Sequence, residues 1–386
     1  MSRIVTALAL MLTSSGALAA QKPEEGAWIV RLGRDTVAVE RYKRTGDAIS
    51  LEQVLHTPQT SLRHAHLEWT TAGRLSKVSM VLRRVGAPMD APLLGSTTLT
   101  VLGDSGSIVV KRGDSTLAPR NIAIKKDAIP ALQLSYLPYE MAAIRLRASK
   151  KDSIEVPLLA FGPQPSIATQ VKRLGKDSVI FSNQFVTYRA KVDKNGRLLG
   201  MHAPGSTFQV KVDRLKAVDI DAIATAWIAA DEKGAKMGTL SIADSVKTNV
   251  GGADIAIRYS RPAKRGRVIF GEIVQWNKVW RTGANSATMF TTSKDLMFGG
   301  THVPAGSYTL WTLPTPTGTT LIINKQTGQW GTDYKPEMDL ARIPMTTKKT
   351  AEPLERFVIV VEPQTNGGVL KLGWDTMEMA VPFTVM

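Results

Sequence analysis

The feature that most constrains the fold of this chain is the alternation of apolar and polar residues in short runs from residue 239 to the C-terminus. A period of two residues is typical of β-strands, because successive side chains of a strand point to opposite faces of a sheet. Turn sequences such as Val250-Gly251-Gly252 and Pro304-Ala305-Gly306 separate the runs. The predicted strands lie at residues 240–248, 253–260, 288–293, 307–312, 319–324, 356–363, 369–374 and 377–383. Residues 239–386 are therefore predicted to form an antiparallel β-sandwich or jelly-roll-like domain.

The preceding part of the chain alternates in the same way, with turn residues such as Gly33-Arg34-Asp35 between the runs. This spacing predicts hairpins, so residues 21–217 are expected to form an antiparallel β-rich domain. One helix is predicted inside it at residues 136–147. A second is predicted at 218–231, where Ile220, Trp227 and Ile228 share a face. Residues 218–238 are predicted to be a helical linker, which makes the fold class mainly β with one or two helices.

A short sequence of the first domain recurs within it, because Arg31-Leu32-Gly33-Arg34-Asp35 returns as Arg173-Leu174-Gly175-Lys176-Asp177. Both copies suit the bend of a β-hairpin. A duplicated domain and the repeated use of a common hairpin both explain this recurrence. A sheet of such hairpins could curl over a hydrophobic ligand, by analogy with the curved antiparallel sheets of envelope lipoprotein carriers.

The first twenty residues are predicted to be a secretory signal peptide. Arg3 supplies a positive start, residues 4–12 an apolar core, and Ala17-Leu18-Ala19 a small-x-small cleavage site. Cleavage near Ala19 or Ala20 would give an exported protein, periplasmic or extracellular. The rest of the chain contains no stretch that resembles a transmembrane segment. Cysteine is absent, which excludes disulfides, thiol catalysis and zinc–thiolate sites.

The chain is basic, with a formal net charge of +16. Residues 21–240 contribute most of it, with 32 Lys and Arg against 21 Asp and Glu. Such a balance favours association with anionic envelope polymers or lipid headgroups. Nucleic acid is not expected as a partner, because no basic helix or aromatic platform for single strands is evident. The predicted partners are envelope polysaccharide, peptidoglycan or lipid, and the oligomeric state stays open.

Several motifs of the second domain carry a resemblance to a known family. They include Tyr259-Ser260-Arg261-Pro262, Arg265-Gly266-Arg267, Val279-Trp280-Arg281-Thr282-Gly283-Ala284-Asn285 and Gly328-Gln329-Trp330-Gly331. In this order, over about residues 240–384, they resemble bacterial secreted proteins of the domain of unknown function 2911 family. That family has no established activity, so the resemblance implies neither a reaction nor a cofactor.

Candidate catalytic residues gather around the Trp280–Asn285 turn. Arg281, Asn285 and Asp295 would be the centre of a hydrolase, with His302 as the nearest base in the sequence. No Gly-x-Ser-x-Gly motif supports such an enzyme. His64 and His66 lie on one face of a predicted strand, a spacing that can ligate a metal. Solvent-facing polar positions explain them as well, so no metal and no cofactor are expected.

Candidate ligand contacts are Trp330 and Tyr334, which flank a loop, followed by Arg281 and Asn285. Trp280, Trp311 and Trp374 are expected to belong to the core instead. The leading hypothesis is a non-catalytic envelope binding module for carbohydrate, peptidoglycan or lipid. The alternatives are a hydrolase centred on Arg281, Asn285 and Asp295, or a structural interaction module.

Overall fold

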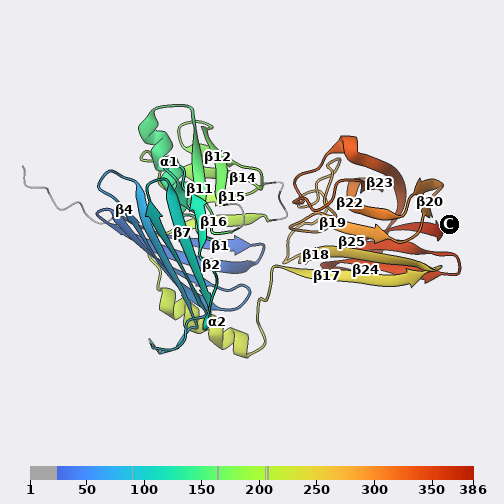
Figure 1. The fold of residues 1–386 in the computed structure, drawn as a ribbon, viewed down its shortest axis with the longest axis horizontal. Helices are drawn as coiled ribbons and strands as arrows, with labels where there is room; N and C mark the ends of the chain where they lie inside the picture. Colours follow the sequence, from blue (N-terminus) through green and yellow to red (C-terminus); the bar gives the residue numbers. More distant parts are fainter. Residues whose placement is uncertain (1–23, 89, 163–164, 205, 207) are drawn as a thin grey trace, which may run out of the picture.

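The structure, a computed structural model, describes residues 24–386 except residues 89, 163–164, 205 and 207. The predicted signal peptide, residues 1–20, lies outside the described residues. Two β-sheets, antiparallel except for one short strand pair, account for most of the described chain (Figure 1), which confirms the mainly β fold class. Strands β1 to β16 form the first sheet and strands β17 to β25 form the second.

The first sheet has sixteen strands in the order β10-β11-β12-β13-β14-β15-β16-β1-β2-β3-β4-β5-β6-β7-β8, and β9 also pairs with β7. Neighbouring strands are antiparallel except for the short β10–β11 pair. The strands are β1 (Glu25–Leu32), β2 (Asp35–Thr45), β3 (Ala48–Leu55), β4 (Ser61–Trp69), β5 (Leu75–Arg83), β6 (Gly95–Leu102), β7 (Ser105–Arg112), β8 (Ser115–Thr116), β9 (Arg120–Ala123), β10 (Ile129–Pro130), β11 (Ser153–Leu159), β12 (Ser166–Arg173), β13 (Ser178–Ser182), β14 (Thr187–Val192), β15 (Leu198–His202) and β16 (Val210–Leu215).

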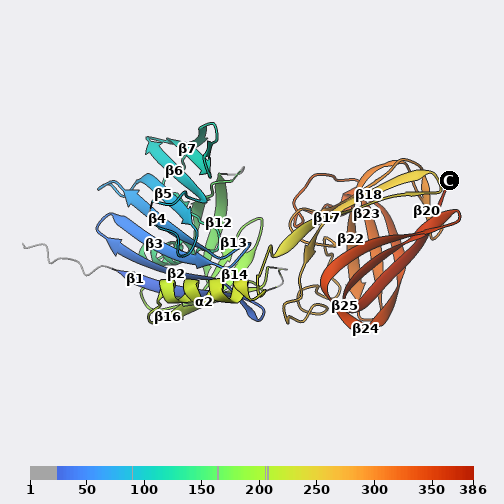
Figure 2. The same ribbon diagram turned by 90° about the horizontal axis from the view of Figure 1, so that it is seen from below.

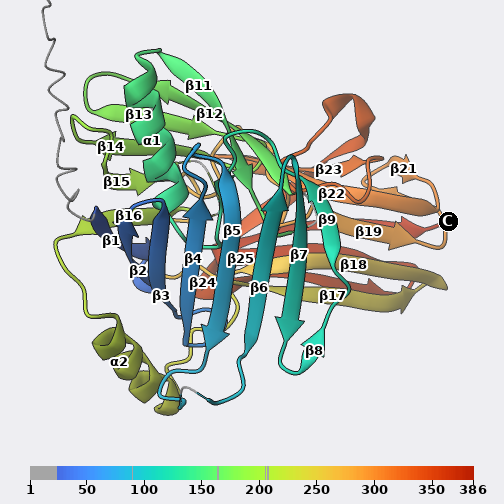
Figure 3. The same cartoon turned by 60° about the vertical axis from the view of Figure 1, so that its left-hand side comes forward.

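This sheet is strongly curled, so that its two ends border one space (Figures 2 and 3). Alternate residues point to the inner face, where Trp28, Val30 and Phe181 are among the buried side chains of one continuous core. Helix α1 (Leu137–Ser149) covers part of this inner face. Helix α2 (Ile220–Glu232) packs on the outer face against Val39 and Val54. The curl therefore separates an apolar concave side from a convex side that is covered only in part.

Both helices were predicted from the sequence within two residues of their observed bounds. Asp219 is the N-cap of α2, because its Oδ1 accepts a hydrogen bond from Ala222 N at 3.0 Å. Gly234 takes a positive φ of 89° just after the helix ends. Each helix has 13 residues, and no helix among the described residues is long and apolar enough to cross a membrane.

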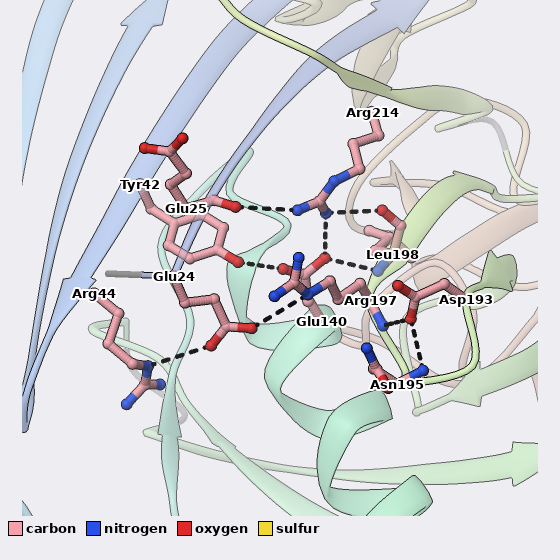
Figure 4. Close-up of polar contacts among 10 residues, drawn as sticks. All are labelled: Glu24, Glu25, Tyr42, Arg44, Glu140, Asp193, Asn195, Arg197, Leu198 and Arg214. Carbon is pink, nitrogen blue, oxygen red and sulfur yellow. Dashed lines mark hydrogen bonds and ion pairs between the residues drawn. The ribbon is translucent and has the colours of Figure 1, made fainter. Parts of the chain in front are cut away.

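A buried carboxylate ties α1 to the inner face of the sheet (Figure 4). Glu140 accepts hydrogen bonds from Arg214 Nη1 at 2.5 Å, from Leu198 N at 2.7 Å and from the Tyr42 hydroxyl. Its side chain is 1% exposed. Burial raises the pKa of Glu140, and the Arg214 guanidinium opposes that rise. The carboxylate thus joins the helix to β2, β15 and β16.

The second sheet follows the order β17-β18-β19-β22-β23-β24-β25-β20-β21. Its strands are β17 (Ser241–Val250), β18 (Ala253–Pro262), β19 (Thr288–Thr292), β20 (Leu296–Phe298), β21 (Thr301–Val303), β22 (Gly306–Thr315), β23 (Gly318–Asn324), β24 (Asp339–Gln364) and β25 (Gly367–Val385), with a short 3₁₀ helix at Pro336–Met338. The long strand β24 pairs first with β23 and then with β25. It is therefore shared by two layers, as the predicted sandwich requires.

Trp280, Trp311 and Trp374 are 6%, 2% and 0% exposed, which confirms their expected place in the core. Trp280 stacks on Trp374 with ring centroids 5.8 Å apart. Two strand predictions in this domain are wrong. The runs at 369–374 and 377–383 form one strand, β25, bent at Asp375 with φ of 51°, and β24 begins at 339 rather than 356. Residues 346–355 of β24 are mostly exposed, so they carry no apolar alternation to predict them.

The two sheets contact each other through hairpins of the first. At the β1–β2 hairpin, Arg34 N donates to Arg265 O at 3.1 Å, and Arg265 Nη1 donates to Asp35 Oδ2 at 2.6 Å. At the β13–β14 hairpin, Thr332 Oγ1 donates to Gln184 O at 2.8 Å. The Arg265-Gly266-Arg267 motif singled out in the sequence therefore supplies part of the junction between the domains.

Candidate ligand-binding sites

The inner face of the first sheet holds a cavity of about 740 Å³. Strands β5 to β7 line one side of it, and β12, β14 and the segment after β11 line the other. Residues 131–136, which lead into α1, complete the lining. Most of its side chains are apolar or aromatic, among them Met80, Leu82, Leu134, Tyr139, Phe161 and Phe208. Its volume lies within the range of pockets that hold small molecules, roughly 300–1,000 Å³.

A buried polar network holds the 131–136 segment against the sheet. Gln53 Nε2 donates to Leu134 O at 2.8 Å, Arg63 Nη1 donates to Gln133 O at 2.7 Å, and Tyr136 N donates to Glu40 Oε1 at 3.3 Å. Arg63 Nη1 also donates to Gln53 Oε1 at 2.6 Å. Side chains of β2, β3 and β4 thus satisfy backbone groups of a segment that lacks a regular partner strand along most of its length.

Burial sets the charge state of this network. Glu40 and Gln53 are 1% and 0% exposed, and burial raises the pKa of Glu40 to about 7. The hydrogen bond from the backbone of Tyr136 opposes that rise. Burial also lowers the pKa of Arg63, which Glu40 partly offsets. Arg63 is the one cation among the cavity residues that comes from the middle of the sheet, on β4.

Three tyrosines form a cluster beside the cavity. Tyr139 and Tyr188 have ring centroids 5.0 Å apart, and Tyr136 lies 6.3 Å from Tyr188. Tyr188 shares side-chain hydrogen bonds with both other tyrosines. Burial raises the pKa of all three phenols well above the ordinary value. The cluster is therefore neutral, with aromatic faces for an apolar ligand and hydroxyls for hydrogen bonding.

A cation marks one end of the cavity. Arg112, at the end of β7, is exposed and lies opposite Gly95 on the inner face of the sheet, whereas its neighbour Lys111 lies opposite Ser96 on the outer face. Arg120 on β9 reaches across to the opposite side of the sheet, where its Nη1 donates to Gly162 O at 2.7 Å and its Nη2 to Phe161 O at 2.9 Å. These two bonds join the ends of the curled sheet.

The residues predicted from the sequence lie elsewhere, mostly near a smaller cleft between the two sheets. This cleft has a volume of about 410 Å³ and is lined by Arg281, Tyr334 and Trp311 on one side and by residues 183–187 on the other. Burial lowers the pKa of Arg281 to about 10. The Tyr334 hydroxyl donates to Asp339 Oδ2 at 2.6 Å, and burial with this bond raises its pKa to about 12.

Trp330 and Asn285, which were predicted from the sequence to contact a ligand, make different contacts within the protein. The Trp330 ring packs edge-on against Phe185 of the first sheet, with centroids 5.8 Å apart, so part of its role is to join the domains. Asn285 is exposed, takes a φ of 61° and donates from Nδ2 to Ser260 Oγ at 3.4 Å. Gly331 packs tightly beside both Arg281 and Asn285.

The proposed hydrolase residues do not form one cluster. Arg281 and Asn285 precede β19, whereas Asp295 and His302 follow it. Five strand residues span on the order of 14 Å. His302 Nε2 and Asp295 Oδ2 are 2.7 Å apart, and both side chains are exposed. The bond from Ala305 N and the contact with His302 lower the pKa of Asp295. These contacts join the two strands at the open end of the β20–β21 hairpin.

His64 and His66 both lie on β4, on its outer face. His66 Nδ1 lies 3.2 Å from Ser50 Oγ, and His64 Nδ1 lies 4.0 Å from Glu52 Oε1. Within the described residues, no group of three or more His, Cys, Asp or Glu side chains could hold a metal ion.

The sequence did not identify the inner cavity residues as a site. Arg63, Tyr136, Tyr139 and Tyr188 come from segments far apart in the chain, and only the curl brings them together. One local signal was available, since Leu132, Leu134, Tyr136 and Tyr139 are closely spaced aliphatic and aromatic residues just where α1 begins.

The fold and the cavity define a two-sheet β protein with a hollow, apolar inner face. Residues 241–383 match the family model described as "Protein of unknown function (DUF2911)", which confirms the resemblance found in the sequence. No curated protein matches the chain.

Two solved structures are similar to parts of the chain. One is a DUF1089 family protein from Pseudomonas aeruginosa, 15% identical over 44% of this chain and 90% of that chain, with a TM-score of 0.30. The other is a β-barrel-like protein of domain of unknown function DUF1849 from Brucella abortus. It is 10% identical over 50% of this chain and 96% of that chain, with a TM-score of 0.33.

Proposed function

We propose that this protein is an exported, non-catalytic binding protein that holds a lipid-type amphiphile in the cavity of its first sheet. Export rests on the signal peptide predicted in residues 1–20. The ligand class rests on the cavity. Among envelope ligands, an apolar chain suits this lining better than a polyhydroxyl ligand does, because most of the lining side chains are leucines, other aliphatic residues and aromatic rings.

The observation that carries this proposal is the combination of an apolar cavity of about 740 Å³ with the cation Arg112 at its end. Burial of the ligand's apolar chain supplies the favourable free energy. Arg112 is placed to contact an anionic headgroup near solvent. The tyrosine cluster and Arg63 supply polar contacts further along the lining.

A binding role also agrees with the positions of the candidate catalytic residues. Arg281 and Asn285 lie at one end of β19, and Asp295 and His302 follow the other end. A hydrolase needs its acid, base and substrate-positioning groups within hydrogen-bond reach of one bond.

The proposal is tested with a fluorescent fatty acid. Mature protein, residues 21–386, is titrated with cis-parinaric acid, and unlabelled palmitate is added to displace it. Saturable binding near one molecule per chain is expected. Met80→Trp, which fills the cavity, should weaken binding at least tenfold. Leu199→Trp adds the same bulk to the outer face, where Leu199 is 48% exposed, and should leave binding unchanged.

A headgroup test completes the experiment. Arg112→Gln should weaken palmitate binding about three- to tenfold and leave binding of the uncharged monopalmitoylglycerol unchanged, because only the carboxylate interacts with the cation. Absence of saturable binding in the wild type, or equal losses in Met80→Trp and Leu199→Trp, would overturn the proposal.

A further inference from the structure

The outer face of the first sheet carries a row of basic side chains that the strand register aligns. Arg189 on β14 lies opposite His202 on β15, His202 lies opposite Lys211 on β16, and Lys211 lies opposite Arg31 on β1. In the other direction, Arg189 lies opposite Ile180 on β13, which lies opposite Lys172 on β12. The row, named here the basic row, therefore crosses six adjacent strands and consists of Lys172, Arg189, His202, Lys211 and Arg31 around one isoleucine.

The geometry of a sheet fixes the spacing of the basic row. Adjacent strands lie about 4.8 Å apart, so the row spans roughly 24 Å. Side chains directly opposite each other on antiparallel strands are close neighbours, and like charges in such pairs are destabilising. Arg189 lies two strands from Lys172 and two strands from Lys211 in this register, roughly 10 Å from each, so their like charges repel and lower the stability of the fold slightly. An anionic partner would relieve that repulsion.

Acidic groups neutralise only one end of the row. Asp213 on β16 accepts from Arg31 Nη1 at 2.8 Å and lies 3.7 Å from Lys211 Nζ. Among the described residues, Lys172 and Arg189 take part in no ion pair within 4.0 Å, although Glu155 and Asp177 lie on or beside neighbouring strands. Lys172, Arg189, His202 and Lys211 are all exposed. Positive charge is thus left uncompensated at the β12–β15 end.

The same face is hollowed and has apolar side chains beside the charges. A groove of about 780 Å³ is lined by Leu174, Arg189, Lys191, His202 and Lys211. Leu174, which lines this groove, is 50% exposed. An exposed leucine contributes little to the binding of a soluble polyanion. A bilayer surface offers anionic headgroups together with an apolar boundary beneath them, where such a side chain can be buried.

We propose that the basic row docks the protein on an anionic lipid bilayer, with Leu174 inserted among the headgroups. This surface is separate from the inner cavity, so the inference does not depend on the proposed ligand. Each cation near an anionic membrane contributes an attraction that corresponds to roughly a fivefold change in partitioning. Loss of two cations should therefore weaken binding roughly 30-fold.

The test is sedimentation of mature protein with vesicles at 50 mM and 500 mM NaCl. We expect binding to phosphatidylcholine vesicles that contain 30% phosphatidylglycerol, little binding to pure phosphatidylcholine, and a strong decrease at high salt. The double variant Lys172→Gln/Arg189→Gln should bind about 30-fold more weakly. The control Lys325→Gln/Lys349→Gln removes two exposed cations from the second sheet and should lower binding less than threefold.

Leu174→Ser distinguishes a bilayer from a soluble polyanion. It leaves the charge unchanged and should still weaken vesicle binding several-fold, with no effect on retention by heparin. Equal binding to both kinds of vesicle, equal losses in the two double variants, or a Leu174→Ser variant that binds vesicles as well as wild type would each overturn the proposal. The substituted side chains are exposed, and an unchanged melting temperature confirms that each variant is folded.

Discussion

The inner and outer faces of the first sheet are made by the same strands and have opposite chemistry. On β14, Tyr188 is buried beside the cavity and its neighbour Arg189 is exposed in the basic row. On β12 the same holds for Val171 and Lys172. Because the side-chain period of a strand is two residues, each face is built independently from alternate positions. One sheet can therefore combine an apolar pocket with a charged surface.

The largest expected difference between the faces concerns two Glu–Arg pairs. Glu140→Ala should lower the free energy of unfolding by about 3–5 kcal/mol, because Arg214 would lose its buried partner. On the outer face, Glu52 pairs with Arg41, and both side chains are more than a third exposed. Glu52→Ala should therefore cost no more than about 1 kcal/mol. Urea denaturation of both variants measures the difference, and similar losses would contradict the contrast.

A smaller change in the free energy of unfolding is expected on the inner face, where the contribution of Glu40 depends on pH. Burial raises the pKa of Glu40 to about 7 in the folded protein, above its ordinary value of 4.5. The stability that depends on protonated Glu40 is therefore present below pH 4.5 and is lost as the pH rises through about 7.

Glu40→Gln, which keeps a neutral side chain at every pH, should remove this loss. Relative to wild type, the variant should gain on the order of 3 kcal/mol between pH 4.5 and pH 8. Denaturant midpoints measured across this range provide the check. A difference between the two proteins that does not change with pH would show that Glu40 does not titrate there.

The smallest expected change in the free energy of unfolding comes from a substitution on the outer face, and it is a gain in stability rather than a loss. Arg189→Gln should raise the free energy of unfolding by a few tenths of a kcal/mol at low salt, because it relieves repulsion from Lys172 and Lys211, each two strands away in the row. The gain should disappear at 500 mM NaCl, where exposed charges are screened. Calorimetry at the two salt concentrations is the measurement. A loss of stability at low salt would show that the row is not repulsive.

Most of the fold was predictable because it depends on local patterns. Alternation identified the strands, and the Asp219 cap with Gly234 beyond the end located α2. The buried tryptophans were predicted to belong to the core because large apolar side chains in alternating strands are mostly buried on the inner face of a sheet. The exposed part of β24 was missed, since a strand without a buried face shows no alternation.

The site was much less predictable, because it depends on contacts between distant segments. Arg31 and Asp213 are 182 residues apart, yet they pair on adjacent strands. The basic row exists only in the register of β12 to β16 and β1, which composition cannot supply. The net charge predicted that a basic surface exists, and the structure shows where the charges align. In the same way, the cavity required the curl that joins β5–β7 to the region of β11–β14.

The hydrogen bonds of Arg120 to Phe161 and Gly162 bear on how rigidly the first sheet is closed. Among the described residues, the strands at the two ends of the first sheet share no backbone ladder. Side-chain bonds from Arg120 to the carbonyls of Phe161 and Gly162 bridge the gap instead. Opening this gap breaks these two hydrogen bonds and leaves every strand pairing of the first sheet intact. The first sheet therefore combines a continuous ladder of paired strands with a side-chain join that can break and re-form without unpairing any strand.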